Sequence, residues 1–287
     1  KPSNMNPAVL PYLLHRYRTS YGYSATLLFE DKFKRKSSNR PDYMAFAPVY
    51  KSNTQQGMQS LPGKFRDQIT PLVWNAVEVR NIGKYLNGLS LIGPEAVEGK
   101  FKKMAADYNI IHLAMHALVD DERPMASRLI FTNTSDTLED GFLNAYELYS
   151  MHIPAQMVVL SACETGFGKF EKGEGVMSLA RGFAYAGCPS VVMSHWLADD
   201  EATAVLMNHF YKHLADGMTK DEALRKAKQT FIQQSDPVRS HPAYWGAFVV
   251  MGDTSSIEET SVLERYWMPA TIFCLVMVTM LFIRMRR

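Results

Sequence analysis

From about residue 43 onward, the chain alternates between two hydrophobic patterns. Short apolar runs, of the kind that form buried strands, are separated by longer stretches in which apolar residues recur at helical spacing. The short runs predict strands at 43–47, 89–92, 110–116, 129–132, 158–160, 190–194 and 244–250. The longer stretches predict helices at 74–86, 96–108, 142–151, 176–183, 205–214 and 219–233. This alternation is typical of an α/β fold with a mostly parallel sheet and helices on both faces.

Capping and polar residues refine this picture. Thr219 followed by Glu222 has the spacing of a capping box, which predicts a helix start there. Ser24 is a candidate N-cap for a short helix at 24–29. Residues 10–14 fit either a strand or a turn, and the basic stretch 32–40 is expected to be a solvated loop.

Two of the predicted strands lead to residues that could carry chemistry. The run Val158–Leu160 continues through two small residues to Cys163 and a turn at Gly166, and the earlier run ends on His116. The carboxyl ends of parallel strands meet at one edge of the sheet, where α/β proteins display reacting groups. Cys163 and His116 therefore form a candidate dyad, although either residue alone would more often be a packed core residue.

The spacing and chemistry of this pair fit a cysteine peptidase. The separation is 163 − 116 = 47 residues, and a caspase-type site has its histidine about 50 residues before a Q-A-C-x-G cysteine. Residues 161–166 (SACETG) are a loose version of that motif. Such an enzyme needs a thiolate nucleophile and an imidazole that protonates the leaving amine. The backbone N–H groups of Cys163 and Ala117 are candidate oxyanion donors.

Around these strands the sequence resembles the CHAT domain, a caspase-like family in the clan that includes separase and the gingipains. The resemblance runs from about Leu10 to Asp253 and implies a caspase–haemoglobinase fold with a His116/Cys163 dyad. Family members are mostly bacterial and often carry tetratricopeptide repeats upstream. The motifs that carry the resemblance are IHLAMH at 111–116, SACETG at 161–166, GEG at 173–175, AGCPSVV at 186–192, SHW at 194–196 and HPAYWGAF at 241–248.

The resemblance also bears on the oxyanion site and on the substrate. The family usually has glycine after the catalytic histidine, whereas Ala117 stands here, and its methyl group could narrow the oxyanion site. The segment that would line the pocket for the residue before the scissile bond supplies Asp199 and Asp200. A carboxylate there would select Lys or Arg. Alternatively, one of the pair caps the following helix. Glu164 is a further substrate-binding candidate.

The composition argues against several other classes of protein. With 287 residues, 47% of them apolar, the chain can bury one large core or two small ones, and its net charge of +2 gives no reason to expect nucleic acid as a partner. Of three cysteines, Cys274 lies in an apolar tail, so at most Cys163 and Cys188 could pair. His209 and His213 have metal-compatible spacing but no third ligand nearby, and no Walker or dinucleotide motif occurs. No metal and no cofactor is predicted.

The C-terminal tail has the composition of a membrane anchor. Residues 267–283 contain no charge over 283 − 267 + 1 = 17 positions, the short end of the roughly 17 to 25 that span a bilayer. Tyr266 and Trp267 stand at the start of this stretch, and Arg284, Arg286 and Arg287 follow it, as at membrane interfaces. A buried terminal helix is the alternative. The predicted organisation is a CHAT-like domain at 1–253, a linker at 254–266, a transmembrane helix at 267–283 and a basic tail at 284–287.

Two functions from different classes fit these features. The first is a membrane-tethered cysteine endopeptidase that cleaves a protein partner after a basic residue, and His116 with Cys163 favours it. The second is a catalytically silent CHAT-fold scaffold or signalling module, which Ala117 keeps open. The chain starts at Lys1 rather than Met, as expected for a fragment of a longer chain, and the resemblance to the CHAT domain implies a repeat domain upstream. Because the family is mostly bacterial, the expected membrane is a bacterial inner membrane. The arginines after the span and the glutamates before it favour a cytoplasmic C-terminus, which would place the domain outside that membrane, whereas an ordinary tail anchor would leave the domain in the cytoplasm.

Overall fold

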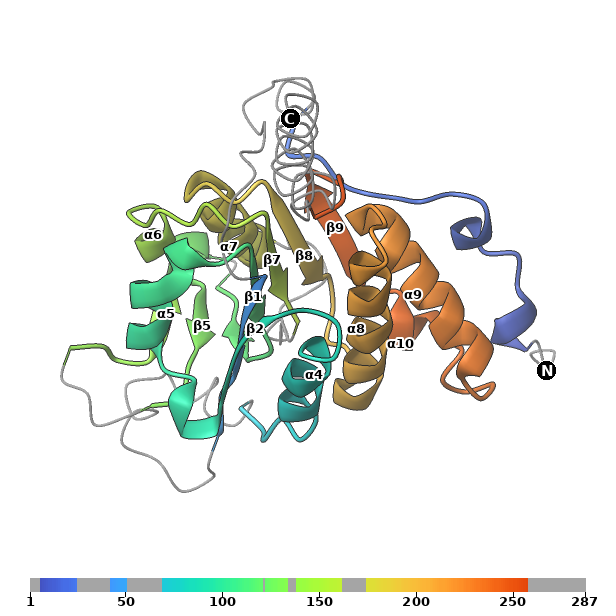
Figure 1. Ribbon diagram of the computed structural model, residues 1–287, viewed down its shortest axis with the longest axis horizontal. Coiled ribbons are helices and arrows are strands. Elements are labelled where there is room, and N and C mark those ends of the chain that lie inside the picture. The colour runs from blue at the N-terminus through green and yellow to red at the C-terminus, as the bar shows by residue number, and fades with distance from the viewer. Residues whose placement is uncertain are drawn as a thin grey trace, which may run out of the picture.

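A six-stranded sheet forms the centre of the molecule (Figure 1). The computed structural model describes residues 6–24, 42–50, 69–120, 122–133, 138–161 and 174–257. The strand order is β2-β1-β3-β7-β8-β9, in which β9 is antiparallel to β8 and the other neighbours are parallel. The predicted mostly parallel α/β fold is therefore confirmed. The strands are β1 (Tyr43–Ala47), β2 (Gly88–Ile92), β3 (Ile110–Leu113), β7 (Met157–Leu160), β8 (Ser190–Ser194) and β9 (Phe248–Gly252).

Helices cover both faces of this sheet (Figure 1). One face carries α5 (Glu98–Met104), α6 (Ala145–Leu148) and α7 (Glu174–Tyr185), and the other carries α4 (Asn75–Ile82), α8 (Asp200–Ala215) and α9 (Lys220–Gln234). Neighbouring strand residues point to opposite faces. Phe46 accordingly packs in the core with α5 and α7, whereas Ala45 packs in the core with α4, α8 and α9. Burial on both sides explains why these strands are almost continuously apolar.

A second, antiparallel sheet was not predicted from the sequence. It consists of β4 (Ala117–Leu118), β5 (Arg128–Ile130) and β6 (Phe142–Asn144). The helix predicted at 142–151 was wrong at its start, because Phe142–Asn144 pairs with β5 and α6 begins only at Ala145. Asn144 explains the boundary, since it forms a capping box with Glu147 and so ends the strand where the helix begins.

Two further boundaries differ from the prediction. The strand predicted at 244–250 is instead a short helix, α10 (Pro242–Trp245), followed by β9. Pro242 lies in the first turn of α10, where its missing N–H is not needed. Thr219 is the residue before α9, but the predicted capping box does not form. Its hydroxyl donates instead to Asp221 Oδ1 at 2.6 Å.

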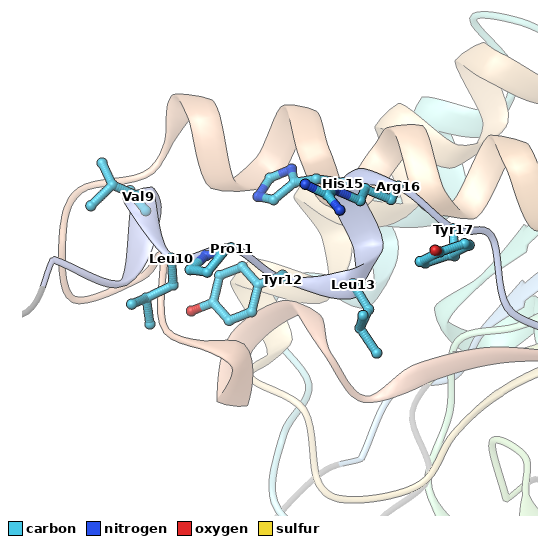
Figure 2. A pocket seen from close by; sticks show the side chains of 9 residues that line it. Val9, Leu10, Pro11, Tyr12, Leu13, His15, Arg16 and Tyr17 are labelled. Carbon is cyan, nitrogen blue, oxygen red and sulfur yellow. The ribbon is translucent and has the colours of Figure 1, made fainter.

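The N-terminal arm adds two 3-10 turns, η1 (Pro7–Val9) and η2 (Leu13–His15). The second overlaps residues 10–14, where the sequence allowed a strand or a turn. The arm lies against α9, because the side chains of Arg225 and Gln229 donate to the Leu14 carbonyl at 3.3 Å and 3.2 Å. Figure 2 shows the arm's own side chains around a hollow of about 570 Å³. This hollow belongs to the arm and includes none of the candidate site residues.

Several predicted features lie outside the described residues. They are the helix at 24–29 apart from Ser24, the basic loop at 32–40, Cys163, Glu164 and the span at 267–283. Within the described ranges, no helix has both the length and the apolar character needed to cross a bilayer.

The fully buried side chain of Lys220 forms an ion pair with the partly buried Asp253, which joins α9 to the end of β9. Its Nζ lies 2.9 Å from Asp253 Oδ2 and also donates to the Asp253 carbonyl oxygen at 3.3 Å. Removing one partner of a buried pair leaves an uncompensated charge, which costs about 3–5 kcal/mol. We expect Asp253→Asn to lower the free energy of unfolding by about 3 kcal/mol in a urea titration.

The control is Lys220→Met, which removes the charge together with the pair. We expect this variant to lose less stability than Asp253→Asn, because no ammonium group is left buried without its carboxylate. A larger loss for Lys220→Met would contradict this account of the pair.

Candidate active site

His116 lies just beyond the carboxyl end of β3 and directly before β4, and its side chain is buried, with the residue only 3% exposed. Both of its backbone groups are held. Its N–H donates to the Tyr50 hydroxyl at 3.0 Å, and its carbonyl accepts from Ile130 N–H at 2.9 Å. The Tyr50 hydroxyl in turn donates to the Ile130 carbonyl at 2.7 Å. The position of His116 is thus fixed between the segment after β1 and strand β5.

A backbone carbonyl selects the tautomer of the His116 ring. Nε2 lies 2.6 Å from the Thr70 carbonyl oxygen. A carbonyl oxygen only accepts hydrogen bonds, so Nε2 must carry the proton. In the neutral imidazole the lone pair is then on Nδ1, which is the nitrogen able to take a proton from a neighbouring group. The Tyr50 ring packs against the imidazole with 4.7 Å between ring centroids and helps to fix its orientation.

His116 and Cys163 follow, by equal numbers of residues, two positions that lie opposite each other in the pairing of β3 with β7. The two strands pair in parallel with Leu113 opposite Leu160, and Ser161 N–H extends the ladder by donating to the Leu113 carbonyl at 3.0 Å. His116 follows Leu113 by 116 − 113 = 3 residues, and Cys163 follows Leu160 by 163 − 160 = 3 residues. The two segments that lead to these residues therefore start side by side, about 4.8 Å apart.

Ala117 opens β4 opposite Leu129 of β5. The hydrogen bond from Ile130 N–H to the His116 carbonyl makes this a non-hydrogen-bonded pair of the antiparallel ladder. In such a pair the N–H groups point away from the partner strand, so the Ala117 N–H is directed away from β5. The methyl group of Ala117 is buried. The other predicted oxyanion donor, the N–H of Cys163, lies outside the described residues, as does Glu164.

Asp199 and Asp200 lie past the carboxyl end of β8, at the same edge of the sheet as His116. Asp199 is the N-cap of α8 and its Oδ1 accepts from Ala202 N–H at 2.8 Å, so the capping alternative is what the structure shows for this residue. Asp200 Oδ2 accepts from Trp74 N–H at 2.7 Å. Burial raises the pKa of the Asp200 carboxyl even though that N–H favours the charged form.

Two groups that hold His116 were missed by the sequence prediction: the Tyr50 hydroxyl and the Thr70 carbonyl. A backbone carbonyl leaves no signal in a sequence, and Tyr50 lies 116 − 50 = 66 residues before the histidine that it contacts. His112, predicted to be a buried and hydrogen-bonded histidine, is confirmed as such. In the described part of the chain, no three His, Cys, Asp or Glu side chains gather as a metal site.

Comparison with known proteins gives one family over most of the chain. The family described as the CHAT domain matches residues 3–253. The human tetratricopeptide repeat protein 28 is 24% identical over 253 residues, which covers 75% of this chain and 10% of that protein. The mouse protein of the same name is 27% identical over 126 residues, covering 44% and 5%. The match with this chain thus spans only 10% of the length of the human relative and 5% of the length of the mouse relative.

The similar solved structures are distant. The crystal structure of the Arg-specific cysteine proteinase gingipain R has a TM-score of 0.45 at 9% identity and covers 80% of this chain and 49% of that one. The separase–securin complex of Saccharomyces cerevisiae has a TM-score of 0.41 at 12% identity, covering 79% and 13%.

The Tyr50 hydroxyl makes two buried hydrogen bonds that hold His116. Tyr50→Phe would leave the His116 N–H and the Ile130 carbonyl without this partner, and an unsatisfied buried polar group costs about 1–3 kcal/mol. We expect a loss of about 2 kcal/mol in the free energy of unfolding, measured by urea titration. Tyr23→Phe is the matched control, because the Tyr23 hydroxyl donates only to the Ala180 carbonyl in the described contacts. A loss no greater than in that control would refute the double role of Tyr50.

Proposed function

We propose that this chain, which belongs to the CHAT domain family, is a cysteine endopeptidase in which Cys163 attacks the substrate and His116 transfers the protons. The observation that carries the proposal is the hydrogen bond from His116 Nε2 to the Thr70 carbonyl, which leaves Nδ1 as the basic nitrogen. The proposal is also supported by the strand register, because His116 and Cys163 each follow, by three residues, one member of the paired Leu113 and Leu160.

The proposed reaction has two steps. His116 Nδ1 takes the proton of the Cys163 thiol, and the thiolate adds to the carbonyl carbon of the scissile peptide bond. Backbone N–H groups, with that of Ala117 as the first candidate, stabilise the oxyanion. The imidazolium gives its proton to the leaving amine, which leaves a thioester. His116 then deprotonates a water molecule that attacks the thioester, and the products are a carboxylic acid and the free thiol.

We assign the residue before the cut as Lys or Arg, and we take Asp199 as the first candidate for binding it. Asp199 uses Oδ1 to cap α8, but a carboxylate has a second oxygen that can accept from a guanidinium or ammonium group. Asp200 is the weaker candidate, because its carboxylate accepts from the backbone of the segment before α4 and burial raises its pKa. Glu164 stays a further candidate through its place next to Cys163.

Two parts of the proposal extend beyond the described residues. The uncharged stretch at 267–283, followed by arginines, supports a single-pass membrane anchor. The similarity to tetratricopeptide repeat proteins supports a repeat domain upstream, which would regulate access of a protein substrate.

The decisive test uses the full chain in detergent micelles. Fluorogenic peptides varied at the residue before the cut would be incubated with the wild-type protein, Cys163→Ala and His116→Ala. We expect cleavage after Arg or Lys, with a loss of more than about 100-fold in each variant, because the nucleophile and the general base each act directly in the reaction. Cleavage that persists in Cys163→Ala would contradict the proposal.

Labelling by a peptide electrophile tests the dyad independently of turnover. We expect Cys163 to be labelled in the wild type and not in His116→Ala. Cys188 is the internal control, since burial raises its pKa to about 12 and should keep its thiol unlabelled in the folded protein. Equal labelling of Cys163 in both proteins would exclude the dyad. No cleavage and no labelling would favour the silent scaffold.

The role of Asp199 can be separated from its role as a helix cap. Asparagine caps helices about as well as aspartate, so Asp199→Asn removes the charge and keeps the cap. We expect kcat/KM for cleavage after Arg to fall by about 10-fold or more, the equivalent of one charge-assisted hydrogen bond. The melting temperature should stay unchanged. An undiminished preference for Arg would assign the pocket to another acidic residue, and Asp200→Asn is the comparison variant.

A further inference from the structure

Glu78 is a buried carboxylate that contacts both β3 and the residue directly after β7. It is on α4, is 2% exposed, and contacts the hydroxyl of Ser161 and the imidazole of His112. These are the partners of its carboxylate in the described part of the chain, and neither is a lysine or an arginine. Burying a carboxyl group costs free energy unless hydrogen bonds compensate it, and the Ser161 hydroxyl supplies one such bond.

The hydrogen bonds around His112 have a defined direction. The Tyr211 hydroxyl lies 3.0 Å from His112 Nδ1, and a hydroxyl can either donate to a ring nitrogen or accept from it. His112 Nε2 lies 3.0 Å from Glu78 Oε1, and a carboxylate oxygen attracts only a ring nitrogen that carries a proton. The proton of the neutral ring is therefore on Nε2, and Tyr211 donates to Nδ1. The angle of this second contact is poorer than that of a hydrogen bond, so its attraction is mainly electrostatic.

The cluster formed by Glu78, His112, Ser161 and Tyr211 links four elements. His112 is in β3, four positions before His116, and Ser161 directly follows β7, two positions before Cys163. Glu78 and Tyr211 come from α4 and α8 on one face of the sheet (Figure 1). The hydroxyl of Ser161 donates to the same oxygen, Oε1, that faces His112. One carboxylate oxygen therefore joins β3 to the point where the chain leaves β7.

The start of α4 holds the same edge of the sheet. Asn75 Nδ2 donates to the Pro48 and Ala114 carbonyls at 2.9 Å and 3.3 Å, directly beyond β1 and β3. The segment before α4 contacts His116 through the Thr70 carbonyl and Asp200 through the Trp74 N–H. Glu78 lies one helical turn after Trp74, and the Glu78 N–H donates to the Trp74 carbonyl at 2.9 Å.

We propose that Glu78 is a positioning residue of the proposed peptidase site, holding Ser161 so that the segment leading to Cys163 leaves β7 at the distance from His116 that proton transfer requires. The inference rests on the proposed function. A misplacement of about 1 Å between reacting groups can cost about 100-fold in rate. Loss of the Ser161 contact should therefore slow the chemical step while leaving substrate binding intact.

The test measures the inactivation rate constant kinact and the inhibition constant KI of a peptide chloromethyl ketone with arginine before the reactive carbon. The full chain would be compared with Glu78→Gln, Ser161→Ala and the double variant. We expect kinact to fall about 10- to 100-fold in Glu78→Gln, with KI within about twofold of the wild type. Because both residues act through one contact, the double variant should be no slower than the slower single variant.

Glu98→Gln is the matched control. Glu98 is also 2% exposed, but it is on α5, on the opposite face of the sheet, where its carboxylate pairs with Lys102 at 2.7 Å and accepts from Gly141 N–H at 2.9 Å. This variant should lose stability and keep kinact. Urea titration of every variant separates a loss of folded protein, which reduces the labelled fraction, from a slower reaction in the folded molecules.

The outcomes distinguish the two proposals. Labelling of Cys163 that does not depend on His116 would overturn the proposed function, and the inference with it. Labelling that depends on His116 but has an unchanged kinact in Glu78→Gln would overturn only the role of Glu78. Additive losses in the double variant would do the same. If Glu78→Gln does not fold, Ser161→Ala decides the question, and an unchanged kinact in that variant overturns the inference.

Discussion

The parallel pairing of β3 with β7 is the constraint on which the candidate site depends. Leu113 opposite Leu160 fixes the relative start of the two segments that lead to His116 and Cys163. A slip of one residue in this ladder would turn every side chain of one strand to the wrong face and bury the wrong set. Because both strands are buried on both faces, the packing against α5, α7, α4 and α8 enforces the register.

The orientation of the His116 ring depends on a segment that is not part of any strand. The segment from Thr70 to Asn75 lies at the carboxyl edge of the sheet and contacts three parts of it: the His116 ring, the Asp200 carboxylate and the carbonyls that follow β1 and β3. A ring whose tautomer depends on one carbonyl can change its chemistry when that carbonyl moves.

Charge is placed in this fold where hydrogen-bond donors converge. Glu78 and Glu98 are equally buried on opposite faces of the sheet, and both are balanced locally, the first by a hydroxyl and an imidazole and the second by Lys102 and a backbone N–H. Lys220 follows the same rule with Asp253. Buried charges of this kind add little stability but penalise alternative packings, because any slip leaves them uncompensated.

The mostly parallel α/β core and its main helices could be predicted from the sequence, because they follow from hydrophobic periodicity, which is a local property of the chain. The sequence also identified the CHAT domain family, through motifs such as SACETG and HPAYWGAF. The sequence could not determine the sheet of β4, β5 and β6, since Phe142–Asn144 is extended only because it pairs with β5. The Thr70 contact with His116 and the partners of Glu78 were likewise decided by the tertiary structure, because each joins residues far apart in the chain through a backbone carbonyl or a shared carboxylate oxygen.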